Sequence, residues 1–247
     1  MTESDYLDVW NQLSAQSAAE LAIAGGRAAA APAWLFVAGY QAAVRWTFPQ
    51  TEFEGWTALA VSEDREGNLP GLTAARGEEG GVLSGWKTWV AASRSVSSVV
   101  VSALPNSAEP SGQAPEFYLL YPNMPGLSMD HRDSPSMLPD LSQGRLCCDQ
   151  VVVSAPLDGS RVKQFAKVEG LMVLLAFLAY AKSSALLEQG VAFLDRLDDR
   201  DGLDAFRAST LELIEGQAYQ LSGDAAAVWA RDQQLLKMYA TPRKRKG

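Results

Sequence analysis

The sequence predicts an α+β protein in which a β-rich middle segment lies between two helical segments. Apolar side chains recur at helical spacing near both ends of the chain, first at Tyr6, Val9, Trp10 and Leu13. Between the ends, the chain is rich in Gly, Pro, Ser and Val and carries short strand-like runs separated by turn residues. A change from helical to strand periodicity and back is typical of an α+β layout with one β module.

The composition is that of an ordinary globular protein. The 247 residues include 47% hydrophobic and 20% charged residues, which supplies enough apolar surface for a core. At roughly 150 residues per domain, this length predicts one or two compact units. The net charge of −8 argues against a general nucleic-acid binder. Cys147 and Cys148 are the only cysteines and are adjacent, which excludes a disulfide scaffold.

Membrane and targeting segments are not expected. The longest apolar run, from Gly170 to Ala181, has 12 residues, so it predicts a buried helix. A membrane-spanning helix needs about 18 or more apolar residues. The first residues, MTESDYLD, are acidic and lack the basic region of a signal peptide. A cytoplasmic location is therefore the expectation.

The N-terminal segment, residues 1–50, is predicted to hold two or three helices. The chain breaks after Ala28–Ala31, because Pro32 is tolerated only in the first turn of a helix. The apolar, alanine-rich run from Trp34 to Trp46 then predicts a helix, which Thr47-Phe48-Pro49 terminates.

The middle segment, residues 51–156, predicts an antiparallel β-barrel or sandwich, because several short strands follow one another at close spacing. Turn residues such as Gly80-Gly81 and Pro122-Asn123 separate the strands, and the polar run Asn106–Ala114 predicts a surface loop. The predicted strands are Thr57–Ser62, Leu72–Arg76, Gly81–Ser84, Thr88–Ala91, Ser98–Ala103, Glu116–Tyr121 and Arg145–Val153.

The C-terminal segment, residues 157–241, predicts a shortened helical bundle followed by a basic tail, residues 242–247. The acidic stretch Asp195–Asp204 is interpreted as a solvated turn, and two helices are predicted at Phe206–Leu221 and Ala225–Tyr239. The stripe that predicts the first helices of this segment consists of Phe165, Val168, Met172, Leu175, Leu178, Leu186, Val191, Leu194 and Leu197.

No residue pattern predicts a metal site or a nucleophilic triad. Asp195–Asp204 lacks the regular spacing and the terminal Glu of a calcium loop, and there is no Cys/His cluster for zinc. His131 is the only histidine and is expected in an exposed loop, while no serine lies in a nucleophile elbow. The tail Arg243–Lys246 is open to two interpretations: a contact with RNA, an anionic lipid or a CoA phosphate, or a solvated terminus.

Four stretches resemble the acyl-CoA dehydrogenases, flavoenzymes with a helical–β–helical layout. Residues 58–63 with Gly67-Asn68 resemble the family's T-E-P-x-x-G-S strand and loop. Residues 81–90, GVLSGWKTWV, resemble G-x-x-L-N-G-x-K-x-W-I-T and are the most specific match. Residues 137–151 resemble the strand with F-x-x-V-x-V-P, and residues 229–241 resemble R-D-x-x-x-x-x-I-Y-E-G-T.

The resemblance has gaps as well as matches. Residues 33–46 resemble the helix before the β domain, but the chain is shorter than usual family members. The opening helices are cut back, and so is much of the C-terminal bundle. The missing part includes the R-x-Q-F-G stretch, which in the family reaches a neighbouring subunit's flavin.

The resemblance implies that FAD binds to the β domain. The first stretch would line the flavin ring and approach the phosphates, while the second would pack against another edge of the ring. A flat apolar wall holds such a ring, and nearby hydrogen-bond donors tune its electronics. By this resemblance the cofactor-binding residues are Leu59, Val61, Ser62, Gly67, Asn68, Trp89, Val90 and Ala91.

Three departures from the family pattern fall within these stretches. Asp64 stands where the family has proline, Asn68 where it has serine, and Ala91 where it has a hydroxyl that bonds the flavin. The same residues can therefore be read as strands and turns of an inherited β domain that has lost its cofactor. Trp86 and Trp89 can likewise be core aromatics.

The resemblance also points to a catalytic base. The family removes the α proton of an acyl thioester with a carboxylate, which most members supply from Y-E-G-T; here Ala240 replaces that glutamate. Isovaleryl-type members place the glutamate on the first helix after the β domain, and Glu169 falls at that position. A glutamate in an apolar helix can have a raised pKa, as a base needs. Alternatively, Glu169 only stabilises the start of the helix, and the family's following Arg is here Gly170.

Two functions follow as expectations. The first is a flavin-dependent oxidoreductase that acts on the CH–CH bond of an acyl-CoA or related thioester, with Glu169 as base. The second is a degenerate, non-catalytic family member that serves as a binding or partner subunit without FAD. In both cases the apolar stripe from Phe165 to Leu178 predicts an oligomer, either a homodimer or a heteromer with a longer paralogue.

Overall fold

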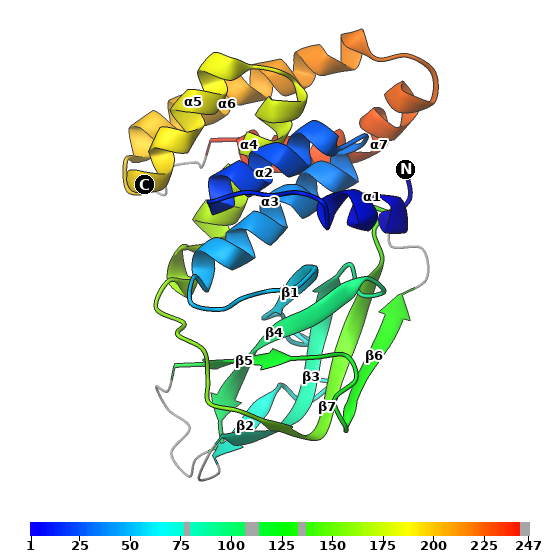
Figure 1. Cartoon of the computed structure of the whole chain (residues 1–247), viewed down its shortest axis with the longest axis vertical. Helices are drawn as coiled ribbons and strands as arrows, with labels where there is room; N and C mark the ends of the chain where they lie inside the picture. Colours follow the sequence, from blue (N-terminus) through cyan, green and yellow to red (C-terminus); the bar gives the residue numbers. More distant parts are fainter. Residues whose placement is uncertain (77–79, 107–113, 133–136, 243–247) are drawn as a thin grey trace. The chain divides into compact units, whose positions relative to one another are not determined.

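The computed structural model describes residues 1–76, 80–106, 114–132 and 137–242 (Figure 1). The described chain forms two compact units. A helical unit combines Asp8–Trp46 with the chain from Lys163 onward, and a β unit combines Thr2–Leu7 with Thr47–Val162. Each unit brings together segments that are far apart in the sequence. The tail at residues 243–247 and most of the predicted loop Asn106–Ala114 lie outside the described residues.

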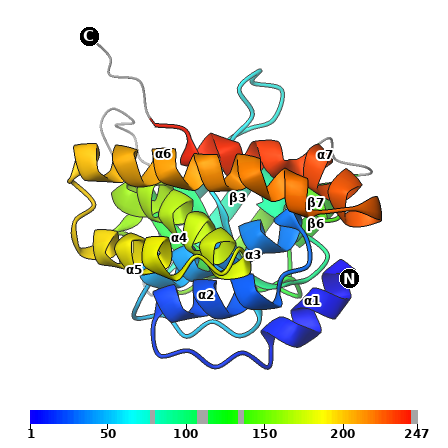
Figure 2. The same cartoon turned by 90° about the horizontal axis from the view of Figure 1, so that it is seen from above.

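Most helices of the chain lie in the helical unit, where α6 and α7 pack against each other (Figure 2). Within the described residues, no helix is both long and apolar enough to cross a membrane. The α-helices are α1 (Glu3–Trp10), α2 (Ala18–Ala28), α3 (Pro32–Thr47), α4 (Phe165–Tyr180), α5 (Ser184–Ala192), α6 (Arg200–Gln217) and α7 (Gly223–Ala240), with short 3₁₀ turns at Val162–Gln164, Phe193–Asp195 and Ala218–Gln220.

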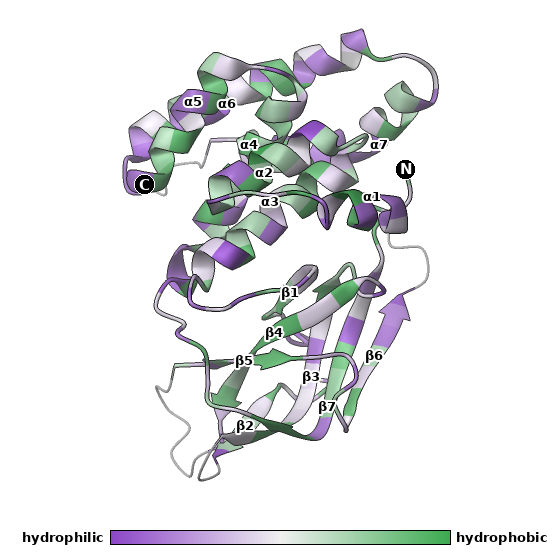
Figure 3. Cartoon of the chain, viewed as in Figure 1, coloured by the Kyte–Doolittle hydropathy of each residue, from purple (hydrophilic) through white to green (hydrophobic). Residues whose placement is uncertain are grey.

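Helix α4 forms the core of the helical unit. Every residue from Gly170 to Ala179 is buried, which confirms the interpretation of this apolar run as a buried helix. Figure 3 colours the visible part of α4 mostly as hydrophobic. Two glycines let neighbouring helices approach its backbone closely. A Cβ on Gly26 of α2 would lie 2.1 Å from the carbonyl oxygen of Ala176, and one on Gly39 of α3 would lie 2.3 Å from the amide nitrogen of Val173. Only glycine fits at these two contacts.

The three helices before residue 50 agree with the sequence, but the interpretation of Asp195–Asp204 as a turn is partly wrong. Helix α6 begins at Arg200 and includes the last residues of this stretch. Asp201 lies in the first turn of α6, where a negative charge favours the helix dipole. An acidic run can therefore mark the start of a helix as well as a solvated loop.

The β unit holds a seven-stranded mixed sheet with the order β1-β4-β2-β3-β7-β6, and β5 pairs with β4. Strand β4 pairs with β1 along Val96–Val101 and with β2 at Leu104 and Pro105. The strands are β1 (Trp56–Ala60), β2 (Thr73–Arg76), β3 (Gly81–Ala91), β4 (Val96–Pro105), β5 (Glu116–Leu120), β6 (Leu127–Arg132) and β7 (Gln143–Val153).

The prediction of an antiparallel sheet is wrong in one respect, because the β1–β4 and β2–β4 pairings are parallel. Strand direction depends on long-range pairing, which local alternation of side chains does not encode. The pairings among the described strands do not close a barrel. The α+β class itself, with a central sheet and flanking helical sequence, is confirmed.

Two strands differ from the predicted ones. The predicted strands 81–84 and 88–91 are one strand, β3, with a register shift at Gly85, whose φ of 124° no other residue type adopts readily. Strand β6 was not predicted, because its side chains are polar or half-buried throughout. It pairs with β7 and carries His131, which therefore lies in a strand and not in a loop.

Candidate functional site

The helical unit contains a carboxylate that is partly withdrawn from water. Glu169 lies on α4 between Val168 and Gly170, which are both buried, and is itself partly buried. Desolvation raises the pKa of the Glu169 carboxyl to about 7, against an ordinary value of 4.5. A carboxyl with this pKa exchanges a proton near neutral pH, which is what a general base requires.

Tyr239 of α7 holds this carboxylate. Its hydroxyl donates a hydrogen bond to Oε1 of Glu169 over 3.1 Å, and this bond moderates the rise in the pKa of Glu169. Burial and the nearby carboxylate together raise the pKa of Tyr239 far above its usual range, so Tyr239 remains a donor. The ring of Tyr239 lies against α4 at Gly170, where a Cβ would come within 3.3 Å of Cδ1.

The alternative reading of Glu169, as a charge that merely stabilises a helix start, has less support from the geometry. Helix α4 begins at Phe165 and has no acidic residue in its first turn. Glu169 is one turn further on, where the attraction of the helix dipole has largely decayed. The negative charge of Glu169 therefore stabilises the helix little, while desolvation disfavours the ionised form of its carboxyl.

The β unit brings the first two resembling stretches side by side. The amide N–H of Thr88 donates to the carbonyl of Ser62 over 2.9 Å, and the amide N–H of Trp86 donates to the carbonyl of Pro70 over 2.9 Å. Lys87 lies between these contacts and is only 1% exposed, with Nζ 2.6 Å from Oε1 of Glu63. The segment after β1 is therefore bonded to the middle of β3 at several points.

The eight predicted cofactor-binding residues fall into two groups. The side chains of Leu59, Val90 and Ala91 are buried in the core of the β unit, so only their backbone atoms could contact a ligand. The other residues are exposed or partly exposed, namely Val61, Ser62, Gly67, Asn68 and Trp89.

Two apolar or aromatic side chains in these stretches are left at least partly exposed. Val61 is 46% exposed although it is apolar, and Trp89 presents a partly exposed indole whose Nε1 is fixed by a hydrogen bond to Oε1 of Gln143, 3.2 Å away. Apolar and aromatic surfaces held in place by backbone bonds are what a planar ring packs against. We call Val61, Ser62 and Trp89 the ring-wall residues.

The loop that follows β1 is poorly suited to binding phosphate groups. The carboxylate of Asp64 accepts hydrogen bonds from the amides of Glu66, Asn68 and Leu69, at 3.0, 2.8 and 2.9 Å. These bonds, that from Glu66 foremost, lower the pKa of Asp64, so the loop carries a fixed negative charge. The amide of Asn68 is already bonded, and a carboxylate repels a phosphate. Gly67, with φ of 75°, shapes the turn.

Two of these features were not found by reasoning from sequence. The hydrogen bond between Tyr239 and Glu169 joins residues 70 positions apart. The resemblance to Y-E-G-T included Tyr239 but did not indicate this hydrogen bond. No local sequence pattern indicated that Lys87 is buried, since a lysine in a strand is normally exposed.

The remaining candidates form no second catalytic cluster. Nδ1 of His131 lies 3.0 Å from Oγ of Ser93, but Ser93 is buried. Cys148 is buried and Cys147 partly exposed; both are free thiols, and desolvation raises the pKa of each. No group of three or more metal-ligating side chains occurs in the portion of the chain that the structure describes.

The comparisons with known proteins identify the fold. No family model matches the chain, and no curated protein does. Solved structures do match: PigA with FAD and proline has a TM-score of 0.63 at 12% identity, covering 96% of this chain and 87% of that one. An FAD-dependent dehydrogenase has a TM-score of 0.58 at 14% identity, with 90% and 78% covered. Butyryl-CoA dehydrogenase from Megasphaera elsdenii has 0.56 at 12% identity, with 91% and 76% covered.

At these identities the likeness concerns the fold alone. The chain has an acyl-CoA dehydrogenase-like fold, as the resemblance in four short stretches predicted. A fold of this kind can host more than one activity, so function must be argued from Glu169 and from the ring-wall residues.

Proposed function

We propose that this chain is a flavin-dependent oxidoreductase that acts on the CH–CH bond of an acyl thioester, with Glu169 as its catalytic base. The observation that carries the proposal is the partly buried Glu169 carboxyl, whose pKa is raised to about 7 and whose Oε1 accepts a hydrogen bond from Tyr239. A carboxylate in this state suits removal of a weakly acidic proton at neutral pH.

In this proposal each group has one role. Glu169 in its ionised form takes the α proton of the acyl thioester at a carboxylate oxygen. Tyr239 donates to Oε1, which orients the carboxylate and leaves Oε2 to accept the proton. Bound FAD would supply the acceptor for the hydride from the β carbon. The ring-wall residues would hold its ring system, while Asp64 opposes the binding of its phosphates.

The cofactor part of the proposal is tested by titration with FAD, FMN and riboflavin, followed by desalting and visible absorption spectroscopy. Val61→Arg places a charged side chain on the ring wall and is expected to abolish flavin binding. Val152→Arg is the matched control, because Val152 is also an exposed valine of the β unit, at 71%. Loss of flavin binding in both variants, or in neither, would contradict the proposal that the ring-wall residues contact the flavin.

A second variant tests the loop. Asp64→Asn removes the charge and keeps one acceptor oxygen, which can still serve the amides of Asn68 and Leu69. It is therefore expected to strengthen FAD binding several-fold without changing riboflavin binding. An equal effect on both ligands would show that the phosphates do not lie near Asp64.

The base is tested by anaerobic reduction of bound flavin after addition of an acyl-CoA. Glu169→Gln is expected to slow reduction by at least about 100-fold, since general bases contribute roughly 10²–10⁴-fold. Glu188→Gln, at an exposed glutamate of α5, is the control and should leave the rate unchanged. Wild-type reduction should become faster as the pH rises through about 7, the pKa of Glu169. A rate unchanged in Glu169→Gln would refute this role.

The charge of Asp64 and the lack of a hydroxyl at Ala91 favour a second candidate, a non-catalytic family member without FAD. Ala91 is buried and has no side-chain hydroxyl that could bond a flavin. Such a chain would act as a partner subunit, in a homodimer or with a longer paralogue. Gel filtration with light scattering would detect the oligomer. Failure to bind any of the three flavins, alone or with such a partner, would favour this candidate over the enzyme.

A further inference from the structure

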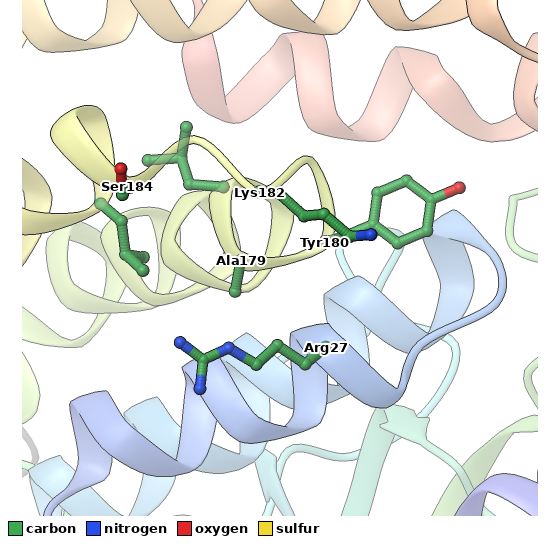
Figure 4. A pocket seen from close by; sticks show the side chains of 7 residues that line it. Arg27, Ala179, Tyr180, Lys182 and Ser184 are labelled. Atoms are coloured by element: carbon green, nitrogen blue, oxygen red, sulfur yellow. The ribbon is translucent and has the colours of Figure 1, made fainter.

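The helical unit contains a pocket of about 330 Å³ at the far end of α4 (Figure 4). This volume lies at the small end of the range of ligand pockets, roughly 300–1,000 Å³. Figure 4 shows Arg27 entering from α2 opposite the end of α4, with Ala179 pointing toward it. The pocket is lined by Arg27, Leu178, Ala179, Tyr180, Lys182, Ser184 and Leu187.

The pocket combines an apolar wall with positive charge. Leu178 and Ala179 are buried, and the ring of Tyr180 is stacked on Trp229 at a centroid distance of 6.2 Å. Arg27 and Lys182 both line the pocket, although the chain as a whole carries a net charge of −8. Within the described parts of the chain, neither cation forms an ion pair.

The backbone at Lys182 supplies an independent observation. Helix α4 ends with bonds from the amide of Ser183 to the carbonyl of Leu178, over 3.0 Å, and from the amide of Lys182 to the carbonyl of Ala179, over 3.3 Å. Lys182 has a φ of 56° in this helix end. Glycine is the residue that normally adopts this conformation here, because any Cβ makes it unfavourable. A lysine in its place gives up stability and positions a cation on the pocket wall.

We propose that this pocket binds an amphipathic anion, a carboxylate or phosphate head on a short apolar chain. Arg27 would hold the head, and Leu178, Ala179 and Leu187 would contact the chain. Figure 4 shows the ammonium of Lys182 pointing away from the guanidinium of Arg27, so Lys182 would attract the anion over a longer range. The pocket is not the site of the proposed oxidation, because Leu178 lies nine positions after Glu169 on α4, which is about 14 Å of helix at 1.5 Å per residue.

The test is isothermal titration calorimetry of the full chain with octanoate, octyl phosphate, 1-octanol and inorganic phosphate. We expect one site per chain that binds octanoate or octyl phosphate at least about tenfold more tightly than 1-octanol or inorganic phosphate. Whichever of the two anions binds more tightly identifies the head group. Binding of 1-octanol as tight as that of octanoate would overturn the role of the cations. Binding of inorganic phosphate as tight as that of octyl phosphate would overturn the role of the apolar wall.

Two variants locate the site. Lys182→Gly removes the cation and installs the residue that the backbone prefers, so the melting temperature should stay equal or rise while the affinity falls about 2- to 3-fold. Arg27→Gln removes the charge that contacts the head and should weaken binding about 3- to 10-fold, and it leaves the end of α4 unchanged. Arg200→Gln is the control, because it removes the same charge from an exposed position of the helical unit. An affinity unchanged in both pocket variants, or equally weakened in the control, would refute the proposal.

Discussion

Replacing Glu169 by glutamine should stabilise the protein at alkaline pH and leave it nearly unchanged at acidic pH. The folded state holds the carboxyl with a pKa of about 7, whereas the ordinary value of 4.5 applies to the unfolded chain. Between these two values the folded state binds the proton that the unfolded state has released, so the stability of the wild type falls as the pH rises. Glutamine has the same shape, accepts the Tyr239 hydrogen bond and carries no charge.

The expected magnitude follows from the same two pKa values. At about 1.4 kcal/mol for each pH unit, the difference between 4.5 and 7 corresponds to about 3 kcal/mol. Glu169→Gln should therefore have about the wild-type stability at pH 4 and exceed it by about 3 kcal/mol at pH 8. Urea unfolding at a series of pH values, followed by tryptophan fluorescence and circular dichroism, measures this. Trp229 of α7 is buried and reports on the helical unit.

The difference between variant and wild type isolates Glu169, because every other titrating group is common to both proteins. A difference that does not change with pH would show that the carboxyl is not desolvated in the folded state. A variant less stable than the wild type at pH 8 would show that the ionised form makes an interaction worth more than its desolvation cost. Either result would refute the reasoning that supports Glu169 as a base.

Three further predictions concern single contacts. Tyr239→Phe removes a donor to the Glu169 carboxylate, so the pH at which flavin reduction reaches half its maximum rate should rise. Urea unfolding should show a loss of about 1 kcal/mol in the free energy of unfolding. An unchanged pH profile would contradict this. Glu63→Gln keeps a hydrogen-bond acceptor but leaves the buried Lys87 ammonium without an opposite charge, so it should cost about 1–3 kcal/mol. Lys87→Met should cost little, and equal costs would contradict the account. Gly39→Ala drives a Cβ into the backbone of α4 and should lower the melting temperature by about 6 °C or more; a smaller shift would mean that the helices separate easily.

The sequence was most informative where local patterns decide structure. The apolar run around α4, the break at Pro32 and the turn-separated strands of the β unit follow from periodicity and from proline and glycine chemistry. The parallel pairings of β4 could not be predicted in this way, since they depend on which distant strands meet. Strand β6 escaped prediction because it buries little apolar surface.

The candidate sites were predictable to a smaller degree. Glu169 could be singled out from sequence because the resemblance to isovaleryl-type acyl-CoA dehydrogenases implied a base at this position, and a lone acid in an apolar helix supported it. Its contact with Tyr239, the burial of Lys87 and the presence of Arg27 and Lys182 at one pocket depend on tertiary packing. The flavin roles of Leu59, Val90 and Ala91 stay predictions, now restricted to their backbone atoms.

The close approach of α2 and α3 to α4 at Gly26 and Gly39 also sets the spacing of functional groups along the unit. Because backbone touches backbone at both places, α4 can neither slide along its neighbours nor turn about its own axis without a clash. The helix therefore holds Glu169, near its start, and Lys182, just past its end, at a fixed separation and orientation. Inserting one residue between Ala176 and Lys182 would rotate everything beyond it by about 100°. Such an insertion would therefore change the direction in which Lys182 points relative to Glu169.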